Sequence, residues 1–158
     1  MFALVVASLA LLPAEPPTVR LDAVSYTDLA TEVKALQGKV VLVDVWGSFC
    51  APCREKFPHV VELHRKYAGR GLTVISVSVD VPGDTDAKAA ARDFLVLQKA
   101  SFRNVILTDK AAVWQEKWKV DGPPLLFVFD NRGRLAGRWE GKFDPAEVEK
   151  KIVKLLDE

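Results

Sequence analysis

The stretch that decides the fold runs from residue 43 to residue 53 and reads Val43-Asp44-Val45-Trp46-Gly47-Ser48-Phe49-Cys50-Ala51-Pro52-Cys53. Its first part ends a β-branched apolar run that starts at residue 39, and such a run is typical of a strand buried on both faces. Its last part places two cysteines at the start of a segment with the apolar period of a helix. We therefore predict a buried strand that leads directly into a helix, with both cysteines at the junction.

Cys50 and Cys53 are the only cysteines among the 158 residues. This number excludes a disulfide-rich scaffold and a four-cysteine zinc or iron–sulfur site. A cysteine at a helix start meets free backbone N–H groups and the positive end of the helix dipole, which both favour the thiolate. Cys50 has that position, whereas Cys53 lies one turn further on and is expected to be more buried. We predict that Cys50 attacks a disulfide and that Cys53 resolves the resulting mixed disulfide.

Asp44 lies within the apolar strand, six residues before Cys50. An ionised carboxylate is expensive to bury, and the ordinary interpretation of such a residue is a polar group with satisfied hydrogen bonds. Here, however, the strand leads straight into a dithiol. An acid with a raised pKa beneath that pair can take the proton from Cys53 during resolution, so we favour a catalytic role for Asp44.

On both sides of this stretch the sequence alternates helix and strand patterns, and a second buried strand after the central helix implies a right-handed crossover with parallel pairing. The sum is an α/β fold with a central mixed β-sheet and helices on both faces. A capping box at 25–28 opens the first predicted helix, and Gly38 closes it. The central helix carries an apolar stripe at Phe57, Val60, Val61, His64 and Tyr67. The remaining predicted elements are a strand at 72–80, a helix at 86–100, a strand at 104–107, a helix at about 110–117 capped by Thr108 or Asp109, a hairpin of 125–129 with 135–139, and a last helix from Pro145 with Asp144 as N-cap.

Length and composition indicate one soluble globular domain, with 49% hydrophobic and 27% charged residues. The formal net charge of +1 argues against a dedicated nucleic-acid binder and against a polybasic membrane-surface protein, because both depend on summed positive charge. No basic stripe accompanies Trp114, Trp118 and Trp139. We therefore expect these tryptophans to line the core or a groove, and we expect no nucleic-acid partner.

The first twelve residues are apolar and carry no charge. This segment is shorter than the roughly 20 residues that span a bilayer as a helix, but it matches the apolar region of a secretory signal. Prolines at positions 13, 16 and 17 are typical of a linker. We predict that residues 1–17 are a signal peptide or a short anchor with a Pro-rich linker, and that residues 18–158 form the folded domain. A mis-assigned start is the alternative, since no Lys or Arg precedes Arg20.

These features together resemble the thioredoxin-like superfamily. The strand at 43–46, the Cys-Ala-Pro-Cys motif at 50–53 and Pro58, five residues after Cys53, match its pattern in position. Gly122-Pro123-Pro124 precedes the strand that starts at Leu125 and matches the Gly-x-Pro loop of the family, with Pro124 at the cis-proline. The resemblance covers nearly all of residues 19–158 and implies a thioredoxin fold with thiol–disulfide oxidoreductase activity.

Within the superfamily, the extra segment at about 81–100 resembles the helical insertion of the TlpA-like branch, which acts in cytochrome c biogenesis. Members of that branch are typically exported to the bacterial periplasm, receive electrons from a membrane or soluble thiol donor, and reduce disulfides in partner proteins such as apocytochromes or copper-site proteins. The resemblance also implies a monomer without a cofactor other than the dithiol. It assigns substrate binding to Trp46, Phe49, Pro123 and Pro124, and structural roles near the site to Ala51, Pro52, Pro58 and Gly122.

Three residues depart from the family pattern. Phe49 replaces the usual Trp before the first cysteine and keeps an aromatic wall. Ser76 replaces a lysine that thioredoxin has near the buried acid, so the sequence supplies no cation for Asp44. Pro123 precedes the cis-proline, where family members use backbone groups to bind the substrate strand. Because a proline has no N–H to donate, substrate docking is expected to be weaker or differently oriented.

Other functions remain open at this point. The same scaffold can act as a disulfide oxidant or isomerase, because the motif does not fix the direction of electron flow. A binding module of another class, a copper chaperone or a holdase, would use the surface of Trp46, Phe49 and Pro123. We expect no metal site, because His59 and His64 point about 140° apart on a continuous helix. A peroxidase is disfavoured, since related peroxidases resemble Thr-x-x-Cys.

Overall fold

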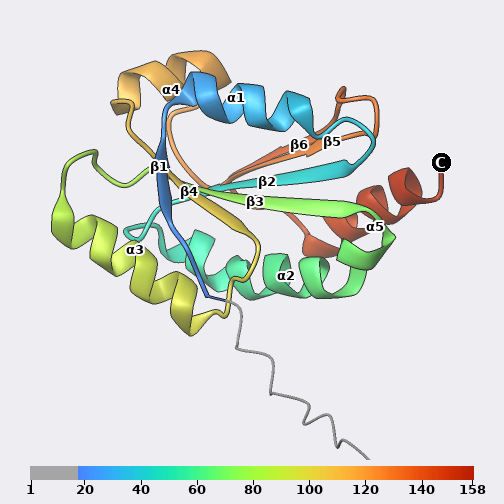
Figure 1. Ribbon diagram of the computed structural model, residues 1–158, viewed down its shortest axis with the longest axis horizontal. Coiled ribbons are helices and arrows are strands. Elements are labelled where there is room, and N and C mark those ends of the chain that lie inside the picture. Colours follow the sequence, from blue (N-terminus) through green and yellow to red (C-terminus); the bar gives the residue numbers. More distant parts are fainter. Residues whose placement is uncertain (1–17) are drawn as a thin grey trace, which may run out of the picture.

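The computed structural model describes residues 18–158, so the predicted signal or anchor segment lies outside the described residues. Six strands form one mixed sheet in the order β1-β4-β3-β2-β5-β6, with five α-helices around it (Figure 1). The elements in chain order are β1 (Asp22–Val24), α1 (Tyr26–Ala35), β2 (Val40–Trp46), α2 (Ala51–Tyr67), a 3₁₀ turn η1 (Ala68–Arg70), β3 (Leu72–Ser78), α3 (Thr85–Leu97), β4 (Arg103–Leu107), α4 (Ala111–Trp118), β5 (Leu125–Phe129), β6 (Leu135–Glu140) and α5 (Pro145–Leu156).

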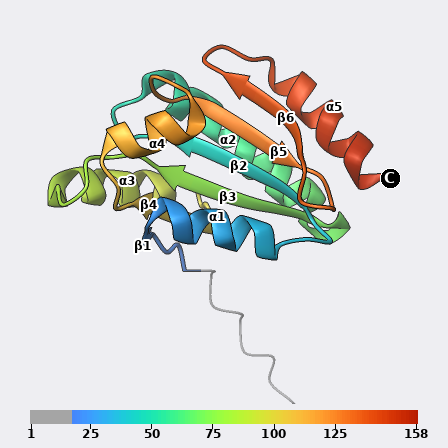
Figure 2. The same ribbon diagram turned by 90° about the horizontal axis from the view of Figure 1, so that it is seen from above.

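Helices cover both faces of the sheet, as the alternating pattern predicted. Helices α1 and α4 lie on one face, and α2, α3 and α5 lie on the other (Figures 1 and 2). The core follows this division, because one buried cluster joins Leu29 of α1 and Trp114 of α4 to the sheet, and another joins residues of α2 and α5 to its opposite face. No helix of residues 18–158 combines the length and the apolar character that crossing a bilayer requires.

Strand β2 occupies the centre of the sheet, and all seven of its residues are buried. It pairs with β3 in parallel and with β5 in antiparallel orientation, which confirms the parallel crossover and the mixed sheet. Val43 and Val45 join the cluster beneath α1, whereas Leu42 joins the cluster beneath α2. Because side chains alternate along a strand, Asp44 and Trp46 share the α2 face with Leu42.

The helix starts predicted from capping residues are confirmed for two helices. The Ser25 hydroxyl accepts a hydrogen bond from the Asp28 N–H at 3.1 Å at the start of α1, and the Asp144 carboxylate accepts from the Ala146 N–H at 2.9 Å at the start of α5. The insertion between β3 and β4 is also helical, as expected, and Asp84 caps it by accepting from two backbone N–H groups.

Three details differ from the prediction. Strand β1 was not predicted, because three residues are too short for a periodic signal. Neither Thr108 nor Asp109 caps α4; the Asp109 carboxylate instead accepts from the Tyr26 N–H, and the Thr108 hydroxyl donates to the Val24 carbonyl. On α2, Leu63 is buried, whereas Val61, His64 and Tyr67 are only half-buried, because the sheet covers a narrower stripe of this helix.

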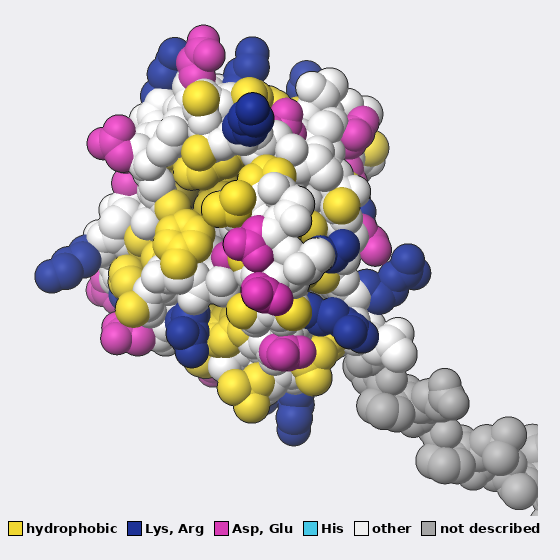
Figure 3. Space-filling model, turned by 90° about the vertical axis from the view of Figure 1, so that its left-hand side faces the viewer, with side chains coloured by type: hydrophobic (Ala, Val, Ile, Leu, Met, Phe, Trp, Pro, Cys, Tyr) yellow, Lys and Arg dark blue, Asp and Glu magenta, His cyan; other side chains and the backbone are white. Residues whose placement is uncertain are grey.

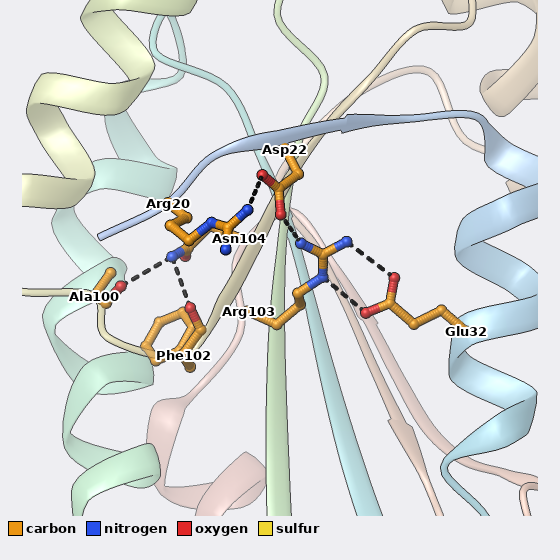
Figure 4. A network of polar contacts seen from close by, with 7 residues as sticks. All are labelled: Arg20, Asp22, Glu32, Ala100, Phe102, Arg103 and Asn104. Carbon is orange, nitrogen blue, oxygen red and sulfur yellow. Dashed lines mark hydrogen bonds and ion pairs between the residues drawn. The ribbon is translucent and has the colours of Figure 1, made fainter. Parts of the chain in front are cut away.

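A cluster of charged side chains attaches the short edge strand β1 (Figure 4). Arg103 of β4 contacts Asp22 of β1 and donates through Nε to Glu32 of α1 at 2.8 Å. Arg20 also pairs with Asp22, at 3.6 Å, but its side chain is 77% exposed against 32% for Arg103. A partly buried guanidinium with two carboxylate partners is the arrangement in which an ion pair contributes most.

We predict that Arg103→Met lowers the free energy of unfolding by roughly 1 to 2 kcal/mol, because two charge-assisted contacts are lost. Urea denaturation measures this change, and faster amide exchange should be concentrated in β1. Arg20→Met is the matched control, since it removes an exposed partner of the same Asp22 and should change stability by less than about 0.5 kcal/mol. Equal effects of the two substitutions would contradict the assignment.

Candidate active site

The junction between β2 and α2 presents the two cysteines. Strand β2 ends at Trp46, and Cys50 is the N-cap of the seventeen-residue helix α2. A tight turn connects them, in which the Cys50 N–H donates to the Gly47 carbonyl at 3.0 Å. Cys50 and Cys53 form a disulfide with their Cα atoms 5.3 Å apart. The predicted position of Cys50 at a helix start is therefore confirmed, and the geometry brings both sulfurs within exchange distance.

The two cysteine residues differ slightly in exposure. Cys50 keeps 7% of its surface exposed and Cys53 keeps 4%, so Cys53 is the more buried, as expected. Cys50 also precedes Ala51 and Pro52, which are both exposed in the first turn of α2. Cys50 is therefore the cysteine nearer to the solvent, and both residues are largely buried in the oxidised protein.

Trp46 lies behind the dithiol. Its side chain is completely buried, and its ring packs 5.3 Å from Phe57 of α2 and 5.1 Å from Phe94 of α3, measured between ring centroids. Cys50 and Cys53 belong to the same buried cluster. The expectation that Trp46 forms a wall of the substrate surface is therefore wrong, because α2 and the insertion helix α3 both cover this end of β2. Trp46 instead supports the dithiol from within.

Phe49 occupies the outer side of the junction. Its side chain is 66% exposed, and its ring lies directly on the backbone of Gly47. A Cβ atom at Gly47 would approach the Phe49 ring to 2.4 Å, so a larger residue there would displace this exposed ring. The result is an exposed aromatic ring immediately before Cys50.

The loop at 122–124 reaches the same end of the sheet. The bond between Pro123 and Pro124 is cis, which confirms the position expected from the resemblance. Leu125, the next residue, pairs with Val45 of β2, so the loop lies at the edge where α2 begins. Pro124 is buried, whereas Gly122 and Pro123 are half-buried. Pro58 is further away, exposed within α2.

Asp44 lies in the middle of β2 on the face that α2 covers. Its nearest cross-strand partners are Ser76 of β3 and Leu126 of β5, and its side chain is 6% exposed. No hydrogen bond to its carboxyl group is formed within residues 18–158, and burial alone raises its pKa to about 7. The carboxyl group therefore changes its protonation state near neutral pH, which is the range that a proton acceptor for a thiol requires.

A second buried carboxylate was not identified from the sequence. Asp80 follows β3 and is 2% exposed. Its carboxylate accepts hydrogen bonds from the Ser48 N–H at 3.0 Å, from the Ser48 hydroxyl at 2.5 Å and from the Ser78 hydroxyl at 2.6 Å. Asp80 thus anchors the turn that precedes Cys50. Its position after a buried parallel strand, at the same edge as the dithiol, was the signal that could have found it.

The two histidines of α2 contact different elements. The imidazole Nε2 of His59 lies 3.1 Å from the Pro145 carbonyl oxygen, whereas the ring of His64 packs against Phe102 at a centroid distance of 5.2 Å. They diverge as the helical spacing requires. Within residues 18–158, no group of three or more His, Cys, Asp or Glu residues is arranged to hold a metal ion.

A dithiol at the start of the helix that follows the central strand, next to a cis-proline loop, is the reactive centre of thioredoxin-like thiol–disulfide oxidoreductases, and the chain is of this class. The Redoxin family model matches residues 14–155. The chain therefore belongs to the redoxin family and, with its helical insertion, to the TlpA-like proteins of the thioredoxin superfamily.

Individual relatives agree with this assignment. The thiol:disulfide interchange protein HelX of Rhodobacter capsulatus is 30% identical over 142 residues, which are 90% of this chain and 75% of HelX. The thiol-disulfide oxidoreductase ResA of Bacillus cereus is 27% identical over 78% of this chain and 68% of ResA. Among solved structures, the thioredoxin domain of a thiol-disulfide oxidoreductase from Bacteroides vulgatus has a TM-score of 0.60 and 27% identity, covering 75% of this chain and 82% of that domain.

We predict that the stability of the oxidised protein falls as the pH rises from about 4 to about 7. Below the pKa of 3.8 that Asp44 has in the unfolded chain, both states are protonated. Between 3.8 and about 7 the unfolded chain releases this proton and the folded chain retains it, so folding loses free energy with rising pH. A difference of about 3 pH units corresponds to roughly 4 kcal/mol.

Urea denaturation of the oxidised protein at several pH values measures this loss. Asp44→Asn is the control, because the amide does not titrate, and the stability of this variant relative to the parent should rise over the same range and level off above about pH 7. A stability difference that is independent of pH would contradict a buried Asp44 with a raised pKa.

Proposed function

We propose that the protein reduces disulfides of exported partner proteins by dithiol–disulfide exchange. The observation that carries this proposal is the arrangement of three groups on β2 and on the first turn of α2. Cys50 is the N-cap of α2 and the more exposed of the two cysteines, Cys53 lies one turn further along the helix, and Asp44 is buried on the sheet face that α2 covers. An accessible nucleophile, a shielded second thiol and an internal proton acceptor are the parts that such an exchange requires.

The exchange proceeds in two displacements. The Cys50 thiolate attacks one sulfur of the substrate disulfide, the S–S bond breaks, and the other substrate sulfur leaves as a thiolate that takes a proton from water. The ionised Asp44 carboxylate then accepts the proton of the Cys53 thiol, and the resulting Cys53 thiolate attacks the Cys50 sulfur. The second substrate thiolate leaves, so the substrate gains two electrons and the protein holds the Cys50–Cys53 disulfide. A membrane or soluble thiol donor restores the dithiol.

The surface around the dithiol supports a protein as the substrate. Hydrophobic side chains gather on the face at which α2 begins (Figure 3), and the exposed large residues at this end include Phe49, Val81 and Leu97. A cavity of about 270 Å³ lies between α2 and α3 and is lined by Ser48, Arg54, Ala90, Asp93, Phe94 and Leu97. Pro123 offers a carbonyl group but no N–H at the cis-proline loop, so apolar contacts carry more of the binding.

The proposal extends to the cellular setting. The apolar residues 1–12 support export, and we place the protein outside the cytoplasm, in the bacterial periplasm, released or N-terminally anchored. The substrates are disulfides of apocytochromes or copper-site proteins in cytochrome c biogenesis. The mechanism uses a monomer and no cofactor other than the dithiol, and the near-neutral charge supports the absence of a nucleic-acid partner.

The direction of electron flow is tested by the equilibrium reduction potential of the Cys50–Cys53 pair. We expect a value near or below about −250 mV, because thioredoxin lies near −270 mV and a strongly oxidising relative near −120 mV. Equilibration with dithiothreitol buffers, followed by alkylation and mass spectrometry, gives the potential.

Asp44→Asn should keep the ability to form the mixed disulfide and should slow its resolution by at least about tenfold at pH 7.

A potential above about −150 mV would contradict the reductase and favour a disulfide oxidant or isomerase. A protein that prevents aggregation or delivers copper equally well as the Cys50→Ser, Cys53→Ser double variant would instead be a binding module. If Asp44→Asn resolves the mixed disulfide at the parent rate, Asp44 is not the proton acceptor.

The apolar docking surface gives a separate prediction. Phe49→Ala should raise the KM for a reducible protein disulfide by roughly three- to tenfold, because an exposed aromatic contact is lost. The rate with a small aromatic disulfide reagent should change by less than about twofold. Leu135→Ala, which removes an exposed apolar side chain from β6, is the control. It should change neither the KM for the protein disulfide nor the rate with the small reagent.

A further inference from the structure

Three polar side chains form a row across the sheet beneath α2. Asp44 of β2 is in register with Ser76 of β3, and Ser76 is in register with Asn104 of β4. Their exposed fractions are 6%, 0% and 1%. Leu42 and Val74, two residues before Asp44 and Ser76 on their strands, belong to the cluster that α2 covers, so the row lies on the same face. Ser78, two residues after Ser76, is also buried on this face, but its hydroxyl donates to Asp80.

The orientation of the Asn104 amide is fixed by its own neighbours. Its Nδ2 group donates to the Ala100 carbonyl at 2.9 Å and to the Phe102 carbonyl at 2.8 Å (Figure 4). These two bonds use both amide hydrogens, and the two carbonyl groups would repel the amide oxygen if the group were turned over. The Asn104 Oδ1 atom therefore points away from them, and as a carbonyl oxygen it can only accept.

This orientation determines where the Ser76 hydroxyl directs its hydrogen. The Ser76 hydroxyl lies 2.7 Å from Asn104 Oδ1 and donates to it. A hydroxyl group has a single hydrogen, so the Ser76 oxygen presents only lone pairs to its remaining neighbours. Asp44 is the adjacent residue in register on the other side. An oxygen that offers only lone pairs repels a carboxylate, but it can accept a hydrogen bond from a protonated carboxyl group.

We propose that Asn104 is a positioning residue for proton transfer at the dithiol: it directs the Ser76 hydroxyl hydrogen away from Asp44 and thereby favours the protonated form of that carboxyl group. The inference rests on the proposed role of Asp44 as the acceptor of the Cys53 proton. Burial already raises the pKa of Asp44. The polar row, in this proposal, raises the same pKa further. An acceptor that titrates near neutral pH can both take the proton and release it again.

Few other groups can act on Asp44. Of the buried side chains of α2, only Cys53 titrates, and it does not titrate in the disulfide. The half-buried Lys56 of the same helix donates to the Phe143 carbonyl at 2.9 Å. Leu126 of β5 and the buried residues of α5 are apolar. Asp80 lies at the end of β3, where Ser48 and Ser78 bind it. The ring of His64 of α2 packs against Phe102, the residue whose carbonyl group accepts from the Asn104 amide.

The test is the pKa of Asp44 in the oxidised protein, followed by the ¹³C shift of its carboxyl carbon and assigned with Asp44→Asn. In Asn104→Leu the Ser76 hydroxyl loses its acceptor, and its hydrogen is free to turn toward Asp44, its in-register neighbour. We expect the pKa of Asp44 to fall by about one pH unit. In the Ser76→Ala background, which has no hydroxyl to release, Asn104→Leu should change this pKa by less than about 0.3 pH unit.

An equal fall in both backgrounds would overturn the proposal, because it would show that Asn104→Leu merely admits water to Asp44. An unchanged pKa would also overturn it. In the parent protein, the Ser76 hydroxyl proton should show a nuclear Overhauser effect to the Asn104 amide protons, and this measurement needs no variant that could fail to fold. A failure of the proposed function is seen in a different measurement, because Asp44→Asn would then resolve the mixed disulfide at the parent rate. The pKa of Asp44 measured here does not depend on that result.

Discussion

The complete burial of β2 is the constraint on which the rest of the structure depends. A strand with seven buried residues, paired on both edges and covered on both faces, has almost no contact with water along its length. A polar side chain placed on it is therefore dehydrated, which is why the pKa of Asp44 is raised to about 7. The same strand ends at Trp46, and a short turn then leads the chain into α2 and the dithiol. A buried acid and a reactive dithiol are therefore only a few residues apart in the chain.

The two buried carboxylates near the dithiol illustrate how environment separates function. Asp80 accepts hydrogen bonds from a backbone N–H and from two hydroxyl groups, and these contacts anchor the turn before Cys50. Asp44 has Leu126 as its neighbour on one side and Ser76 on the other. The hydroxyl hydrogen of Ser76 points to Asn104. A carboxylate surrounded by donors acts as an anchor, whereas one without donors is available for proton exchange.

Much of the fold could be predicted because local signals agreed with one another. The β-branched run at 40–46, the capping residues Ser25 and Asp144, and the turn between β5 and β6 each specify their element through the backbone or through neighbouring residues. Strand β1 carried no such signal, since its formation depends on pairing with β4 and on the contacts of Arg103. The cap predicted for α4 was wrong because Asp109 binds the start of α1 instead, a contact between residues distant in sequence.

The sequence by itself determined the position of the dithiol at a helix start and the presence of a buried acid on the preceding strand, because each follows from residue type and spacing along one segment. The cis bond before Pro124 was expected from the family resemblance. Only the tertiary structure decided that Trp46 faces inward, that Asp80 binds the active-site turn, and that Asn104 orients the Ser76 hydroxyl. These relations join β2, β3, β4 and α3, which are separated along the chain. Their contacts arise from strand order and register, and neither is encoded by the periodicity of a single segment.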